Sequence, residues 1–137
     1  MSRITRSLVA LAVSITVAVV FASPALAIYA HLATALSGPA INGVVPGGNA
    51  TVDQSGLPAK PLTLDLQVTN INIPDGTVLN VVLTDCGTAP VGTVKLNREQ
   101  GQLRTKVPGC QVGRTSAIYV NKGSTTILSG GAPWQVG

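Results

Sequence analysis

The side chains that could support catalysis or bind a metal are few and widely spaced along the 137 residues. His31 is the only histidine, so a metal site with two imidazole ligands is excluded. A tetrahedral zinc site would have to combine His31 with Cys86, Cys110 and a carboxylate, and a disulfide between the two cysteines would prevent it. We therefore predict no metal site, and we expect His31 to lie on the exposed face of a strand.

Acidic side chains could act as a general acid and base if two of them met in a cleft. The chain has five of them: Asp53, Asp65, Asp75, Asp85 and Glu99. Asp65 fits a polar strand face and Asp75 a turn, which leaves Asp85 the least explained. The sequence has neither a Gly-x-Ser-x-Gly elbow nor a phosphate-binding loop. We predict no catalytic residue, no cofactor and no enzymatic activity; an enzyme would need a concave polar site around Asp85 or His31.

Cys86 and Cys110 are the only two cysteines. An even pair in a small exported domain indicates a disulfide. Gly87 follows the first cysteine and Pro108-Gly109 precedes the second, so a bridge would join two turns at one edge of the domain. Redox-active pairs usually have two intervening residues, and here there are twenty-three. The sequence therefore predicts a structural disulfide between Cys86 and Cys110.

The first 27 residues have the three parts of a secretory signal peptide. Arg3 and Arg6 give the positively charged start. Residues 8–22 form an apolar run, and Ala25-Leu26-Ala27 behind it is a small-x-small cleavage site. As a helix the run would span about 22 Å, which is short of the roughly 30 Å of a bilayer core. We predict cleavage after Ala27 and a secreted or periplasmic chain that does not span a membrane.

Residues 28–137 then form a single domain. Seven lysines and arginines face five acids in it, and this net charge of +2 is too small to argue for nucleic-acid binding. The positive residues gather in the second half, where the candidate anion-binding residues are Arg98, Arg104, Lys106 and Arg114. They could attract an anionic glycan or a lipid headgroup, or they could be ordinary solvated residues on polar strand faces.

Residues 61–86 indicate the fold class most clearly. Four apolar residues, Leu62, Leu64, Leu66 and Val68, alternate with polar ones, which is the period of a strand with one buried face. Pro74-Asp75-Gly76 is a turn sequence, and residues 78–83 read as a second, more apolar strand. The sequence therefore predicts a β-hairpin at the centre of the protein.

The rest of the domain reads as further short strands with no helical segment. They are expected over residues 28–36, 50–54, 91–96, 103–107, 116–120 and 125–129, with residues 42–49 as a loop. About eight short strands at roughly ten-residue spacing predict an all-β fold, an antiparallel β-sandwich that is immunoglobulin-like or a small barrel. Trp134 is expected to fold back over the core as a plug.

Three segments resemble a group of small secreted bacterial β-sandwich proteins of unassigned function. They are residues 73–81 (IPDGTVLNV), residues 91–96 (VGTVKL) and residues 127–130 (ILSG). The opening Leu36-Ser37-Gly38-Pro39 is also faintly similar to CHRD-type modules, whose mid-domain histidine strand this chain lacks. Both resemblances imply a β-domain, and neither implies a reaction or a ligand.

Two classes of function remain open from the sequence. The first is a structural or protein-interaction module of the periplasm or cell surface, whose partner is an unknown protein or envelope component. The second is a small binding protein for an anionic glycan or lipid headgroup, which would use the basic second half. A salt titration separates them, because binding to an anionic polymer through solvated charges weakens as ionic strength rises.

Overall fold

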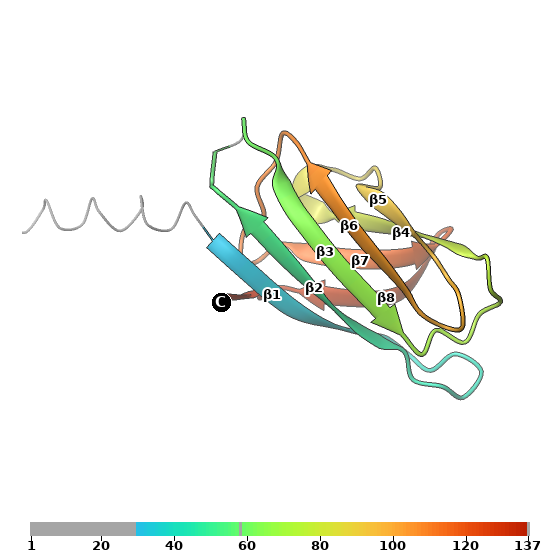
Figure 1. Ribbon diagram of the computed structural model, residues 1–137. Helices are drawn as coiled ribbons and strands as arrows, with labels where there is room; N and C mark the ends of the chain where they lie inside the picture. The colour runs from blue at the N-terminus through green and yellow to red at the C-terminus, as the bar shows by residue number, and fades with distance from the viewer. Residues whose placement is uncertain (1–29, 58, 137) are drawn as a thin grey trace, which may run out of the picture.

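The structure of the chain is a computed structural model that describes residues 30–57 and 59–136. The predicted signal peptide, residues 1–27, lies outside the described residues. The elements are β1 (Ala30–Ser37), β2 (Gly47–Gln54), β3 (Leu62–Thr69), β4 (Val78–Leu83), a 3-10 helix η1 (Thr84–Cys86), β5 (Gly92–Lys95), β6 (Gly101–Val107), β7 (Ala117–Lys122), β8 (Thr125–Gly131) and β9 (Gln135–Val136). Figure 1 labels the eight longer strands. The predicted all-β fold is confirmed.

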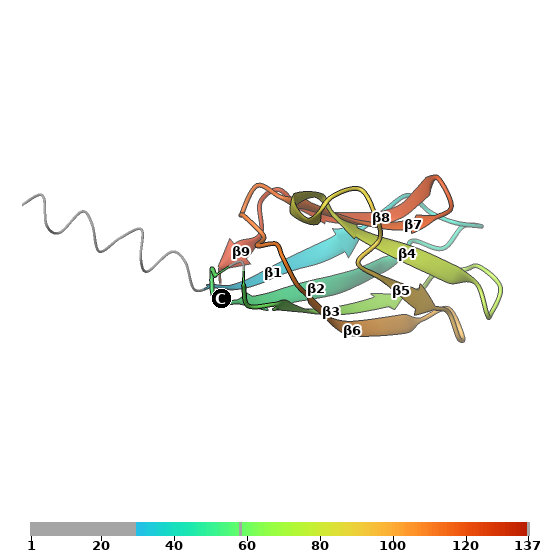
Figure 2. The same cartoon turned by 90° about the horizontal axis from the view of Figure 1, so that it is seen from above.

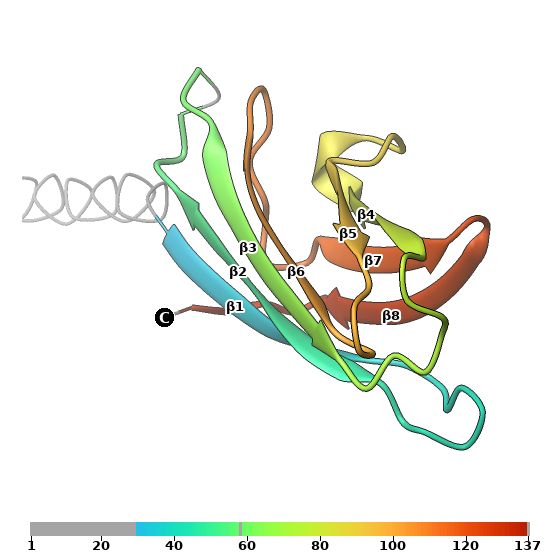
Figure 3. The same ribbon diagram turned by 45° about the vertical axis from the view of Figure 1, so that its right-hand side comes forward.

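The strands form two layers joined along one side. One layer is β1-β2-β3-β6 and the other is β5-β4-β7-β8, and all pairings are antiparallel. The layers are joined where Ser37 of β1 pairs with Ser129 of β8. The other two edges, β5 and β6, are consecutive strands linked by a tight turn (Figures 2 and 3). The result is an antiparallel sandwich that closes into a nearly complete barrel.

The core follows from the alternation of the strands. The four apolar residues of β3 are all at most 1% exposed, and each contributes about 1.5–3 kcal/mol by burial. Leu79, Val81 and Leu83 of β4 face them from the opposite layer and are fully buried. The core therefore fills the space between the two layers, and the polar residues of the same strands face outwards.

The predicted central hairpin is wrong. β3 pairs with β2 and β6, whereas β4 pairs with β5 and β7 in the other layer. The link between them is too long for a tight hairpin loop, and it carries Ile71 and Ile73, which are buried at 0% and 9% exposure. Because both isoleucines are buried, this link crosses the core from one layer to the other. The turn at Pro74-Asp75-Gly76 does form, with Gly76 at φ 89° and a hydrogen bond from Thr77 N to Pro74 O.

The loop predicted over residues 42–49 is correct only in its first part, because β2 begins at Gly47. Gly48 can lie in this strand because it has no side chain: a Cβ there would be 2.2 Å from the backbone O of Gln67. The close approach of β3 therefore extends β2 into a glycine-rich stretch that strand propensity disfavours.

The loops gather at two ends of the barrel. We call the end with residues 38–46, 70–77, 96–100 and 123–124 the turn pole, and it lies at the right of Figure 1. We call the other end, with residues 55–57, 59–61, 84–91 and 108–116, the disulfide pole. Strands that follow one another along the chain run in opposite directions. Successive loops therefore lie at opposite poles.

The disulfide pole is held by two predicted features. The predicted disulfide Cys86–Cys110 is present, with its Cα atoms 5.4 Å apart. The predicted plug is confirmed as well: Trp134 is fully buried, and its indole N–H donates to the backbone O of Ser116 over 3.0 Å. Gln54 adds a third tie, because its buried amide bonds both the N–H and the C=O of Val112.

Candidate functional site

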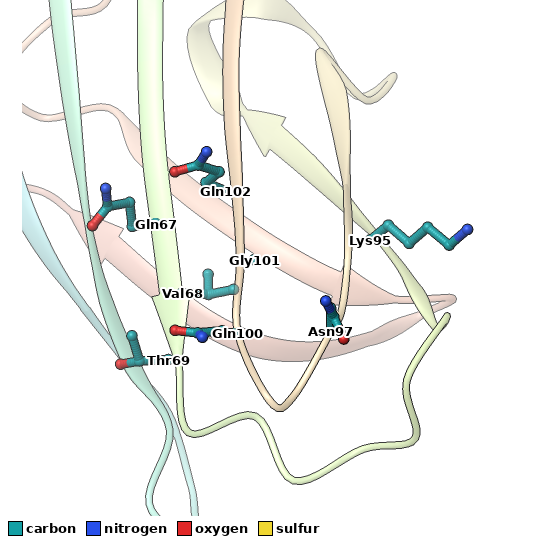
Figure 4. A pocket seen from close by; sticks show the side chains of 8 residues that line it. All are labelled: Gln67, Val68, Thr69, Lys95, Asn97, Gln100, Gly101 and Gln102. Carbon is teal, nitrogen blue, oxygen red and sulfur yellow. The ribbon is translucent and has the colours of Figure 1, made fainter.

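A hollow of about 500 Å³ opens where β3, β5 and β6 meet at the turn pole (Figure 4). Its polar lining residues are Gln67, Thr69, Lys95, Asn97, Gln100 and Gln102. Four of these six carry a side-chain amide, and we call the site the amide hollow. Figure 4 shows the amides of Gln67 and Gln102 on neighbouring strands and that of Gln100 further toward the turn, near Thr69, while Lys95 extends away.

The strand register brings the first two amides together. Gln67 of β3 and Gln102 of β6 are direct cross-strand partners, and Asn49 of β2 is the partner of Gln67 on its other side. Side chains of opposed residues stand on the same face of a sheet, about 5 Å apart at Cβ. Three amides thus form one row across three strands on the outer face of this layer.

The other two amides are placed by the turn between β5 and β6. Asn97 and Gln100 pair across it through hydrogen bonds of 2.9 Å and 3.2 Å, leaving only Arg98 and Glu99 as loop residues. These two residues have φ angles of 55° and 66°, as a type I′ turn requires. Such turns normally use Asn-Gly, because a residue with a Cβ costs about 1 kcal/mol or more in the left-handed region.

Contacts from the loop between β3 and β4 hold this strained turn. Arg98 N donates to the carboxylate of Asp75 over 2.8 Å, and Ile71 N donates to Glu99 O over 2.8 Å. Gly76 N also donates to the carbonyl O of Leu96, over 2.8 Å. The backbone of the turn is therefore held by hydrogen bonds from the loop between β3 and β4, and this fixes where Asn97 and Gln100 leave the chain.

The close approach of β5 to β6 gives the hollow its floor. A Cβ at Gly101 would lie 2.4 Å from Val94 Cγ1 and 3.1 Å from Lys95 O. A Cβ at Gly92 would likewise lie 2.7 Å from a methyl group of Leu103. Because both positions are glycine, β5 and β6 can pack closely against each other. This places Lys95 and Asn97 next to β6.

The amides of the hollow are free to bind. Among the described residues, the side-chain amides that hydrogen-bond within the protein are those of Asn42, Gln54 and Gln111. The amides of Gln67, Asn97, Gln100 and Gln102 make no hydrogen bond to another described residue. Each amide offers two donor hydrogens and an acceptor oxygen, so the hollow presents a dense set of both kinds of group.

The structure distributes the four predicted anion-binding residues over the whole length of the barrel. Arg98 lies at the tip of the turn pole, and Arg114 lies in a loop of the disulfide pole, where its Nε donates to Trp134 O. Arg104 and Lys106 lie on the outward face of β6, and Arg104 pairs with Asp65 over 3.0 Å. None of the four lines the amide hollow, and anion binding by the set stays a prediction.

The other candidate residues have structural partners. His31 is exposed as predicted and pairs across strands with Asp53. The carboxylate of Asp85 accepts the backbone N–H of Gly113 over 2.8 Å, which ties η1 to the loop that carries Cys110. In the part of the chain that the structure describes, no three His, Cys, Asp or Glu side chains lie close enough to hold a metal ion.

A second hollow, of about 560 Å³, lies at the turn pole between three loops. Its apolar lining is Pro39, Ala40, Ile41, Ile73, Pro74 and Ile127, and its polar rim includes Asn42, Asn72, Lys122, Thr125 and Thr126. We call it the loop hollow. It shares no lining residue with the amide hollow. Neither hollow was predicted from the sequence, although the glutamines at 67, 100 and 102 were a visible signal.

No protein-family model matches the chain, and neither a curated protein nor a solved structure matches it. Within residues 30–57 and 59–136, no helix is long and apolar enough to cross a membrane. The disulfide indicates an oxidising compartment.

Proposed function

We propose that this chain is a non-enzymatic protein-interaction module of the periplasm or cell surface. In this proposal residues 1–27 export the chain, cleavage follows Ala27, and the remaining domain contacts its partner through the turn pole. The disulfide between Cys86 and Cys110 supports the exported location, because such bonds persist in oxidising compartments.

The observation that carries the proposal is the loop hollow with its fixed frame. Ile41 and Val44 bond each other through backbone hydrogen bonds of 2.8 Å and 3.0 Å across a tight turn. Asn42 Nδ2 donates to Asn72 O over 3.2 Å and so joins two of the loops. Loops held in one conformation lose little entropy on binding, which favours recognition by a preformed surface.

The lining of the loop hollow defines the chemistry of the partner. Its floor suits an aliphatic or proline side chain, and Lys122 is the single charged lining residue. Two exposed apolar side chains stand at the same pole, Val45 at 67% and Val78 at 51% exposure. Apolar surface around a hollow with a polar rim is typical of protein contacts. The partner segment therefore presents an apolar side chain with an acidic residue beside it.

A charge-reversal experiment tests this function. The mature domain serves as bait for proteins of its native cell envelope, with Lys122→Glu as the test variant and Lys60→Glu as the matched control at the disulfide pole. We expect the control to retain the captured partner and Lys122→Glu to lose most of it. Equal capture by both variants would show that the loop hollow is not the contact surface.

A further inference from the structure

The amide hollow has several features that the proposed protein contact at the loop hollow does not require. Four amides from two strands and the turn beside them line one hollow, and none of them hydrogen-bonds to another described residue. The turn that places Asn97 and Gln100 contains two residues with positive φ where Asn-Gly would be less strained. Strain of this kind clusters at functional sites.

The chemistry of the lining selects one class of ligand. A planar amide donates and accepts at neighbouring atoms, and a hydroxyl group also does both. A saccharide with several hydroxyl groups can therefore meet Gln67 and Gln102, which are direct cross-strand partners, and Gln100, which lines the same hollow two residues before Gln102. The hollow has one charged lining residue, Lys95, so charge attraction is a minor part of the recognition.

We infer that the amide hollow binds a saccharide, with Gln67, Gln100 and Gln102 hydrogen-bonding its hydroxyl groups. The inference does not rest on the proposed protein contact, because the two hollows share no residue. No aromatic platform is at hand among the described residues: Trp134 is buried, and Tyr119 lies on β7 in the other layer. Binding through hydrogen bonds alone is weak, with a Kd in about the millimolar range.

The test is a titration of the 15N-labelled mature domain followed by NMR, which detects each side-chain NH2 group separately. The probes are maltohexaose, chitohexaose and an oligogalacturonate, and phosphatidylglycerol vesicles represent a lipid headgroup. We expect at least one saccharide to shift the NH2 signals of Gln67, Gln100 and Gln102. Raising the salt from about 50 mM to about 500 mM should change its affinity less than about twofold, because hydrogen bonds to neutral groups are little screened.

Variants locate the site. Gln67→Ala/Gln102→Ala should weaken saccharide binding about tenfold, because it removes two hydrogen-bonding groups. Gln135→Ala is the matched control, since Gln135 is an exposed glutamine on β9, and it should bind like the wild type. The inference is overturned if no saccharide shifts these signals, if high salt abolishes binding, if only the vesicles act, or if the double variant binds as well as Gln135→Ala. The backbone amide signals of the double variant, recorded in the same NMR titration, show whether it keeps the wild-type fold.

Discussion

The double substitution Arg98→Asn/Glu99→Gly should stabilise the protein. The two native residues have φ angles of 55° and 66°, in a region that favours glycine and tolerates asparagine. The contacts that hold the turn use backbone atoms, Arg98 N to Asp75 and Glu99 O to Ile71 N, so the variant retains them. The substitution therefore removes strain and leaves the hydrogen bonds in place.

The size of the effect follows from two opposing terms. A residue with a Cβ in the left-handed region costs about 1–2 kcal/mol; glycine removes this cost at position 99, and asparagine, which tolerates the region better, reduces it at position 98. Glycine returns about 0.5–1 kcal/mol of that gain, because it is more flexible in the unfolded chain. We expect a net gain of about 1 kcal/mol in the free energy of unfolding. For a domain of about 110 residues this raises Tm by about 4 °C.

Urea unfolding followed by circular dichroism measures the difference. Arg98→Ala/Glu99→Ala is the matched control, because it removes both charges and keeps a Cβ at each position. If the control is stabilised as much as the Asn-Gly variant, charge rather than backbone strain accounts for the gain. If the Asn-Gly variant is no more stable than the wild type, the strained turn has been misinterpreted.

Four further variants test three contacts of the disulfide pole. Cys86→Ser/Cys110→Ser opens a loop of about 25 residues and should lower the free energy of unfolding by about 3.5 kcal/mol, measured in urea against the oxidised wild type. Trp134→Ala should cost about 3–5 kcal/mol by leaving a cavity, and Trp134→Phe clearly less, by thermal unfolding. Gln54→Leu should cost about 2–4 kcal/mol, because it leaves both backbone groups of Val112 unpaired, and hydrogen exchange at Val112 should then accelerate. If one of these variants is as stable as the wild type, the contact that it removes does not stabilise the protein as described.

The sequence predicts the strands well because their signal is local. Each apolar residue of β3 is buried as its alternation with polar residues indicates, and the same period places Gln102, Arg104 and Lys106 of β6 outside. The disulfide also follows from local information, since two cysteines allow a single pairing. These features need no knowledge of which strands are neighbours.

The pairing of the strands depends on contacts that are distant in sequence. From the sequence, the segment with Ile71 and Ile73 could turn back as a hairpin or cross the core to the other layer. Only the packing of the two layers against each other determines which path the chain takes. The amide hollow is hidden for the same reason, because the register of β3 with β6 aligns Gln67 with Gln102 across 35 positions of chain. Its signal in the sequence is three glutamines close to strand ends and a turn, which a solvated strand face would also show.

Site-specific photo-crosslinking tests most directly whether the turn pole is the contact surface. A benzophenone side chain at Val45 probes the turn pole, and one at Leu57 probes the disulfide pole; both native residues are exposed, at 67% and 49%. In intact cells of the native host, a protein adduct should form from position 45 and be absent from position 57. An adduct from position 57 alone would contradict the proposed function.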